Sequence, residues 1–131
     1  MEDWLFVYGT LRRDISVKSE LLDPYVVYAG RAFILGCLYE VDGYPGAVES
    51  QAADERVFGE LYQLIRPNEG LAVLDEYEEC SAAYAQPHEY VRKRVLVWQE
   101  SGARIEAWCY VYNRDVQGLQ RIDPGDYASF K

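Results

Sequence analysis

Hydrophobic residues near the start of the chain form an unbroken run instead of alternating with polar ones. The run spans Trp4 to Tyr8 and contains three aromatic side chains. A strand with one face in water would alternate apolar and polar positions, so this run predicts a strand that is buried on both faces. It ends at Gly9, where the pattern predicts a turn.

The segment that follows, Gly9-Thr10-Leu11, is the first candidate for chemistry. Glycine lacks the Cβ atom that hinders tight turns, and it lets backbone N–H groups approach a ligand closely. A turn here, at the end of a buried strand, would present amide groups suited to a carboxylate. The alternative is an ordinary glycine that ends a strand, which is a common arrangement.

Stretches rich in β-branched and aromatic residues predict further strands. Their bounds are 33–41, 56–64, 90–98 and 104–112, with a short additional strand over 25–28. Gly36 and Gly59 lie inside the first two and favour bulges or bends. Residues 42–46 are dense in turn formers, and residues 99–103 suit a hairpin between the last two strands.

One segment predicts a helix of several turns. Pro67 and Asn68 end a strand and open a helix over residues 69–79, with Asn68 as the expected N-cap. A shorter helical turn is expected over residues 19–23, closed by Pro24. The C-terminal tail shows no regular period and is assigned no element.

The order of strands, one main helix and further strands predicts an α+β fold and excludes the regular alternation of a doubly wound sheet. Glycines within strands allow the bends of a closing sheet, so we expect a curved, partly closed antiparallel or mixed sheet. No repeat, linker or low-complexity stretch divides the 131 residues. This length suits a single domain over residues 1–131.

Composition and charge narrow the expected partners. Half of the residues are apolar and 15% are aromatic, which excludes disorder, and no apolar run approaches the roughly 20 residues of a membrane span. The acidic start lacks the features of a secretory signal, so we expect a cytoplasmic protein with no membrane partner. A net charge of −9 repels phosphate backbones, and nucleic acid is not an expected partner.

Metals and cofactors are not expected. The three cysteines, Cys37, Cys80 and Cys109, are widely spaced and predict buried, reduced thiols instead of a disulfide framework. The only histidine, His88, leaves no Cys/His cluster for a metal, and the carboxylates lack the spacing of a calcium loop. A serine or threonine nucleophile would also lack a neighbouring histidine as its base.

The predicted helix carries a carboxylate on its apolar side. At about 100° per residue from Leu71, Leu74 falls at about −60° and Glu78 at about −20°. An inward carboxylate must be hydrogen-bonded, ion-paired or raised in pKa by desolvation, and the last case makes it a general base near neutral pH. A salt-bridged or snorkelling glutamate is the alternative. Asp75, at about +40°, is interpreted as a surface or capping acid.

Two short segments, Val7–Arg12 and Leu74–Glu78, carry a family resemblance. Together they resemble the signature loop and the Leu-Asp-x-x-Glu helix of the γ-glutamyl cyclotransferase-like superfamily, also called AIG2-like. Each is short, but the two are specific in combination. Supporting matches lie at residues 36–39, 43–45, 59–62, 90–92, 107–112 and 122–127.

The resemblance implies a small mixed β-barrel with flanking helices. It also implies an enzyme that converts a γ-glutamyl compound to 5-oxoproline and a released amine or amino acid, with Glu78 as the general acid/base and no cofactor. Most aromatic residues of the predicted strands are expected in the core, but a minority line pockets. We place two of them, Tyr90 and Tyr110, in the substrate pocket. The predicted substrate-binding residues are Tyr8, Gly9, Thr10, Leu11, Tyr90 and Tyr110.

This chain departs from the family pattern directly after Glu78, where the family usually has glycine and this sequence has Glu79. A second carboxylate there would raise the pKa of Glu78 or favour a cationic leaving group. Our hypothesis is a monomeric cyclotransferase that acts on a γ-glutamyl amine or a γ-glutamyl amino acid. The alternatives are a small-molecule binding or regulatory module without turnover, and a structural interaction domain.

Overall fold

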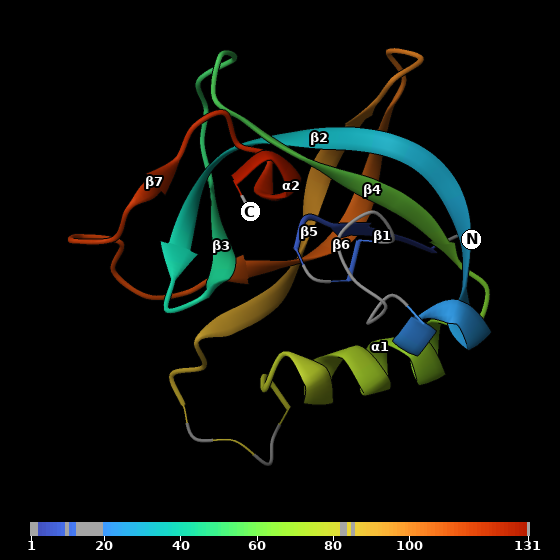
Figure 1. Ribbon diagram of the computed structural model, residues 1–131. Coiled ribbons are helices and arrows are strands. Elements are labelled where there is room, and N and C mark those ends of the chain that lie inside the picture. The colour runs from blue at the N-terminus through green and yellow to red at the C-terminus, as the bar shows by residue number, and fades with distance from the viewer. Residues whose placement is uncertain (1–2, 10, 13–19, 82–83, 85, 131) are drawn as a thin grey trace.

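The computed structural model describes residues 3–9, 11–12, 20–81, 84 and 86–130. These residues form a curved sheet with α1 lying along one side (Figure 1). No helix in the described ranges is both long and apolar enough to span a membrane. In chain order the elements are β1 (Asp3–Val7), the 3-10 helix η2 (Asp23–Tyr25), β2 (Val26–Val41), β3 (Tyr44–Glu49), β4 (Arg56–Leu64), α1 (Pro67–Tyr77), β5 (Tyr90–Gln99), β6 (Arg104–Tyr112), β7 (Arg121–Ile122) and α2 (Tyr127–Phe130).

Five of the strands close into a barrel. Their order is β2, β4, β1, β6 and β5, and β5 returns to pair with β2. β1 and β6 run parallel, with Leu5 beside Trp108, and the other neighbours in the barrel are antiparallel. The prediction of an α+β fold with a mixed β-barrel is confirmed, and the barrel is closed instead of partly open.

The long strand β2 belongs to two parts of the sheet. Its first half pairs with β4 and β5 and closes the barrel, whereas its second half pairs with β3 and β7. The prediction of separate strands over 25–28 and 33–41 is therefore wrong. A register shift between Tyr28 and Gly30, with Gly30 at a φ of 119°, marks a bulge that bends the strand without ending it.

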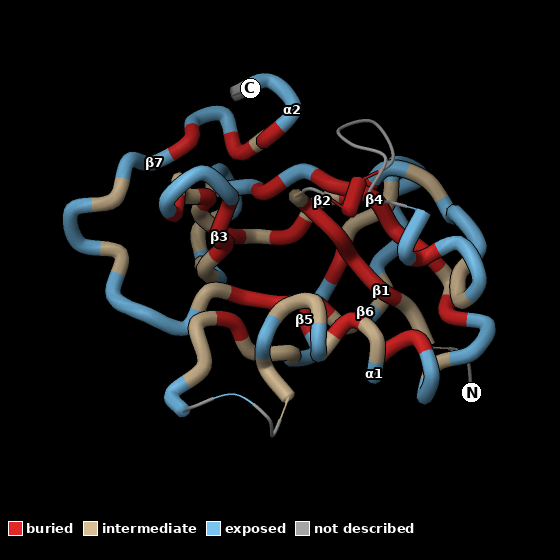
Figure 2. The backbone as a smooth tube through the Cα atoms, turned by 60° about the horizontal axis from the view of Figure 1, so that its bottom comes forward, coloured by how far each residue is buried: buried red, intermediate tan, exposed pale blue. Residues whose placement is uncertain are grey.

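β1 is buried on both faces, as its unbroken apolar run predicts (Figure 2). Phe6 on one face belongs to the core inside the barrel. Leu5 and Val7 on the other face belong to a second core that also contains Leu71 and Leu74 of α1. Full burial of one such side chain contributes roughly 1.5–3 kcal/mol. β1 therefore holds the helix against the barrel.

Gly59 in β4 is required because the neighbouring strand comes very close. A Cβ atom at this position would lie 2.1 Å from the carbonyl oxygen of Val7 and 2.8 Å from the ring of Phe6. Only a residue without a side chain fits beside β1 here. The sequence associates Gly59 with a bend, but in the structure it allows β4 and β1 to pack closely.

α1 begins at Pro67, two residues before its predicted start. Proline suits the first turn of a helix because its missing N–H would have no intrahelical partner there. The N-cap is Arg66, which makes no capping hydrogen bond through its side chain, so the expectation of Asn68 as the N-cap is wrong. Gly70 brings α1 close to η2, since a Cβ atom there would lie 2.9 Å from the Cβ atom of Tyr25.

The C-terminal segment forms structure where the sequence predicts none. β7 pairs with β2, and the N–H of Phe58 donates a hydrogen bond to the carbonyl of Gly125 at 2.8 Å. Tyr127 at the start of α2 is only 2% exposed and packs in the barrel core. Near the other end of the chain, Pro24 lies inside η2 and does not close the helical turn predicted over 19–23, of which residue 19 is outside the described residues.

Candidate active site

A cavity of about 430 Å³ opens where the end of β1, the turn between β2 and β3, and the end of α1 meet. This volume lies within the range of small-molecule sites. The cavity brings together most of the residues predicted to act on substrate, although they come from distant parts of the sequence. Those that line it are Tyr8, Gly9, Leu11, Glu78, Tyr90 and Tyr110. Thr10 lies outside the described residues.

Gly9 lets the turn after β1 pack closely against the start of β3 beside this cavity. A Cβ atom at this position would lie 2.8 Å from Cγ of Pro45, closer than such atoms pack. The carbonyl of Gly9 accepts a hydrogen bond from the N–H of Arg12 at 2.9 Å, which closes the turn after β1. The need for glycine here comes from close approach, because the left-handed conformations of the chain lie elsewhere among the described residues.

Tyr8 packs in the barrel core and links the site to two other strands through its hydroxyl. Its hydroxyl donates to the carbonyl of Tyr110 at 2.6 Å and accepts from the N–H of Ala47 at 3.2 Å. Burial raises the pKa of Tyr8 well above its ordinary value, so the phenol stays neutral. With its hydroxyl occupied at both ends, Tyr8 is suited to hold the turn that follows it in place.

Tyr90 and Tyr110 form a wall of the cavity, and their hydroxyls are also engaged. The hydroxyl of Tyr90 donates to the carbonyl of Pro45 at 2.7 Å. The hydroxyl of Tyr110 donates to Oδ1 of Asp75 at 2.7 Å. Burial raises the pKa of both phenols. They therefore contribute rigid aromatic surface and remain neutral.

Glu78 is the C-cap of α1, and its N–H donates to the carbonyl of Leu74 at 2.8 Å. Its carboxylate lines the cavity and has no hydrogen bond or ion pair to any residue that the structure describes. Burial, with a smaller effect from the nearby Glu89 carboxylate, raises the pKa of Glu78 to about 7. A carboxyl group of this kind can both accept and donate a proton near neutral pH.

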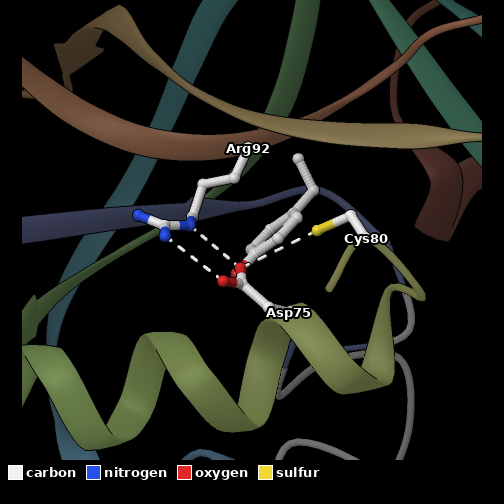
Figure 3. Close-up of polar contacts among 4 residues, drawn as sticks. Asp75, Cys80 and Arg92 are labelled. Atoms are coloured by element: carbon white, nitrogen blue, oxygen red, sulfur yellow. Dashed lines mark hydrogen bonds and ion pairs between the residues drawn. The ribbon is translucent and has the colours of Figure 1, made fainter. Parts of the chain in front are cut away.

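Asp75 anchors the end of α1 to the sheet (Figure 3). Its carboxylate accepts hydrogen bonds from Nε of Arg92 at 2.9 Å and from Nη2 at 3.2 Å, in addition to the Tyr110 hydroxyl. The thiol of Cys80 lies 3.7 Å from Oδ1. The interpretation of Asp75 as a surface or capping acid is therefore wrong, because the helix edge that carries it faces β5 and β6.

The turn that ends α1 also fixes Glu78. The N–H of Cys80 donates to the carbonyl of Asp75 at 2.9 Å, and the N–H of Glu79 donates to the carbonyl of Glu76 at 3.1 Å. These two bonds define a Schellman motif, whose left-handed position is usually glycine. Glu79 occupies that position with a φ of 58°.

Two more acidic residues line the cavity: Glu79, which the sequence places directly after Glu78, and Glu89, which the sequence analysis did not assign to the site. Glu89 directly precedes β5 and accepts a hydrogen bond from the hydroxyl of Tyr44 at 2.9 Å. No local pattern marks Glu89, since its place depends on how the loop before β5 returns to the barrel. The three cysteines are free as predicted, but only Cys109 is buried, and Cys37 and Cys80 are half-buried.

Fold and site together define a small β-barrel protein with a ligand cavity, lined by a carboxyl group, Glu78, whose pKa is raised to about 7. A family model described as "Gamma-glutamyl cyclotransferase, AIG2-like" matches residues 5–129. The chain belongs to this family, as the two signature segments indicate. Membership places it in a cyclotransferase-type enzyme family whose ligands are small γ-glutamyl molecules.

Named relatives agree with this assignment. The chain is 32% identical over 128 residues to the γ-glutamylcyclotransferase family protein YtfP of Escherichia coli K12, with 94% of each chain covered. It is 34% identical over 112 residues to the γ-L-glutamyl-butirosin B γ-glutamyl cyclotransferase of Niallia circulans, covering 85% of this chain and 67% of that one. The crystal structure of an AIG2-like protein from Mus musculus shares the fold, with a TM-score of 0.70, 22% identity and coverage of 93% and 86%.

Proposed function

We propose that this protein is a γ-glutamyl cyclotransferase that converts a γ-glutamyl amine or γ-glutamyl amino acid into 5-oxoproline and the free amine. The observation that carries the proposal is that the unpaired Glu78 carboxyl and the turn after β1 share one cavity. The relatives' names support the reaction type.

The reaction needs no nucleophile from the protein. The α-amine of the substrate attacks its own side-chain carbonyl carbon, which forms a C–N bond and closes a five-membered ring. The amide C–N bond then breaks and releases the leaving amine. A bound and correctly oriented substrate gains much of the acceleration from proximity, since the reaction is intramolecular.

Glu78 has the proton affinity that this reaction requires. The α-amine is protonated in solution and must lose a proton before it attacks, whereas the leaving nitrogen must gain one. A carboxyl group with a pKa of about 7 is present in both forms near neutral pH, so it can accept the first proton and return it to the leaving nitrogen. It has no hydrogen bond or ion pair to the residues that the structure describes, which leaves it free to contact substrate.

The turn after β1 is suited to hold the α-carboxylate of the substrate. We assign the backbone N–H groups of Gly9, Thr10 and Leu11 to this role, with Tyr8 fixing the start of the turn through its two hydrogen bonds. Backbone amides bind a carboxylate by charge-assisted hydrogen bonds. Tyr90 and Tyr110 supply the aromatic wall that excludes water from the reacting atoms.

Glu78→Gln tests the assignment directly. The amide keeps the shape of the side chain but cannot exchange the proton, so we expect kcat/KM for 5-oxoproline release to fall by about 10²–10⁴-fold. Glu76→Gln is the matched control, because Glu76 is exposed on the same helix and lies outside the cavity. Full turnover by Glu78→Gln, or no turnover by the unaltered protein across a broad panel of γ-glutamyl compounds, would contradict the proposal.

A binding or regulatory module without turnover is the second candidate. It is favoured by one observation: the hydroxyls of Tyr8, Tyr90 and Tyr110 all donate to protein oxygen atoms, so none is free to stabilise an oxyanion without breaking a bond. This candidate requires γ-glutamyl compounds to raise the melting temperature equally in the unaltered protein and in Glu78→Gln, with no 5-oxoproline formed by either.

A further inference from the structure

The lining of the cavity carries an excess of negative charge, and we call the part formed by Glu79 and Glu89 its rim. Three of its described lining residues, Glu78, Glu79 and Glu89, have carboxylates, and none of the described lining residues has a basic side chain. Only Glu78 is needed for the proposed proton transfers. Two carboxylates therefore remain without a role in the chemistry of the ring closure.

Glu89 is held at the rim by contacts that do not cancel its charge. The hydroxyl of Tyr44 donates to its Oε1 at 2.9 Å, which fixes the direction of the carboxylate by a neutral donor. Nη1 of Arg114 lies 3.7 Å from Oε2, but the Arg114 side chain is 52% exposed and that of Glu89 is 28% exposed. Solvent screens such a pair strongly. Its closeness to Glu78 is evident from its effect on the pKa of that group.

Glu79 contributes charge at a cost to the fold. Its φ of 58° places a side chain at the left-handed position of the Schellman motif, where glycine is free of strain. The carboxylate has no hydrogen bond or ion pair within the described part of the chain, so no structural contact offsets that cost. A strained residue at a ligand cavity is a reason to look for a role in binding.

We propose that Glu79 and Glu89 select substrates whose leaving amine carries a second positive charge. This inference rests on the proposed function and narrows its substrate class. Glu78 meets the scissile nitrogen, so the remainder of the leaving group extends toward the rim where the other two carboxylates lie. A protonated amine there is attracted, whereas the carboxylate of a γ-glutamyl amino acid is repelled.

Three synthetic probes of similar length separate the effect of charge from that of shape. They are γ-L-glutamyl amides of 1,5-diaminopentane, of pentylamine and of 6-aminohexanoate, whose leaving groups end in a cation, a methyl group and an anion. We expect kcat/KM to fall in that order for the unaltered protein. The preference for the cation over the neutral probe should weaken as salt is added, because the rim is open to solvent.

Glu79→Gln and Glu89→Gln remove each charge in turn. Each should lower the ratio of kcat/KM for the cationic probe to that for the neutral probe by about fivefold, as expected for one partly screened charge. The ratio is the proper measure, because loss of Glu89 also alters the pKa of Glu78 and this affects both probes alike. Glu76→Gln removes one charge outside the cavity and should leave the ratio unchanged.

The possible results separate the inference from the function on which it rests. An unchanged ratio in both variants, or the same ratio change in Glu76→Gln, overturns the inference while leaving the cyclotransferase proposal intact. If neither the probes nor the broad panel of γ-glutamyl compounds yields 5-oxoproline, the proposed function is overturned. Calorimetric binding of the three probes to Glu78→Gln then decides the inference: the same charge order supports it, and equal affinities overturn it.

Discussion

At the scale of single residues, the raised pKa of Glu78 suits proton transfer but lowers the free energy of unfolding. Its pKa of about 7 in the folded protein exceeds the ordinary 4.5 because burial disfavours the charged form. The charged carboxylate has no partner among the described residues to offset the loss of water. Folding is therefore opposed whenever Glu78 is ionised, and this arrangement is reasonable only if the free carboxylate has a function.

We expect Glu78→Gln to stabilise the protein at high pH but not at low pH. Between pH 4.5 and about 7 the unfolded chain has lost the Glu78 proton while the folded chain keeps it, so this group lowers the free energy of unfolding as pH rises. The stabilisation by glutamine should reach at most about 3 kcal/mol at pH 8 and approach zero at pH 4.

Urea denaturation of both proteins at pH 4, 6 and 8 measures this difference. Stability curves that stay parallel across this range would show that the carboxyl group of Glu78 titrates normally and loses little water on folding. Glu76→Gln again provides the control for loss of one formal charge, because Glu76 is exposed on α1.

At the scale of elements, the end of α1 is defined more tightly than its beginning. Arg66 gives no capping hydrogen bond through its side chain, whereas the C-terminal end has a Schellman motif and the contacts of Asp75 with Arg92. The thiol of Cys80 also approaches Asp75 at this end. The secured end is the one that presents Glu78 to the cavity, so the position of the carboxyl group is specified by backbone and side chain together.

Glu79→Gly should stabilise this helix end. Glycine adopts the left-handed conformation without a clash of its Cβ atom, so we expect a gain of about 1 kcal/mol in the free energy of unfolding. Glu79→Ala is the matched variant, because it removes the carboxylate but keeps the strained Cβ, and it should leave stability nearly unchanged. An equal gain in stability in both variants would show that the charge of Glu79, not its conformation, sets the cost.

At the scale of the whole molecule, the C-terminal segment completes the barrel core and supports the site. Tyr127 is 2% exposed, and its hydroxyl donates to the carbonyl of Gly43 at 3.2 Å. Gly43 belongs to the turn that lines the cavity. Arg12, which follows the turn after β1, forms an ion pair with Asp126 at 2.8 Å. The same segment thus contacts two of the turns around the candidate active site.

We therefore expect Tyr127→Ala to destabilise the protein by about 3–5 kcal/mol, the usual cost of removing a large buried side chain. Tyr127→Phe keeps the ring and should cost only about 1 kcal/mol from the lost hydrogen bond. Chemical denaturation gives both values. If Tyr127→Ala unfolds at the same denaturant concentration as the unaltered protein, the C-terminal segment is peripheral to the barrel and does not complete its core.

The sequence by itself determined the features that depend on neighbours along the chain. The unbroken run of β1 indicates burial on both faces, and helical spacing places Glu78 with Leu71 and Leu74, because these patterns repeat within one element. The two signature segments also indicate the family. The N-cap was mispredicted because Asn68 and Pro67 both favour helix starts, and the fixed φ of proline places the helix start at Pro67.

Only the tertiary structure decided which distant segments meet. The parallel pairing of β1 with β6, the return of β5 to β2 and the packing of Tyr127 join residues that no local period relates. The same holds for Glu89, whose place at the cavity depends on the path of the loop before β5. Burial and pairing between distant strands follow from the free energy of the whole packed molecule, so they cannot be read from any one stretch of the chain.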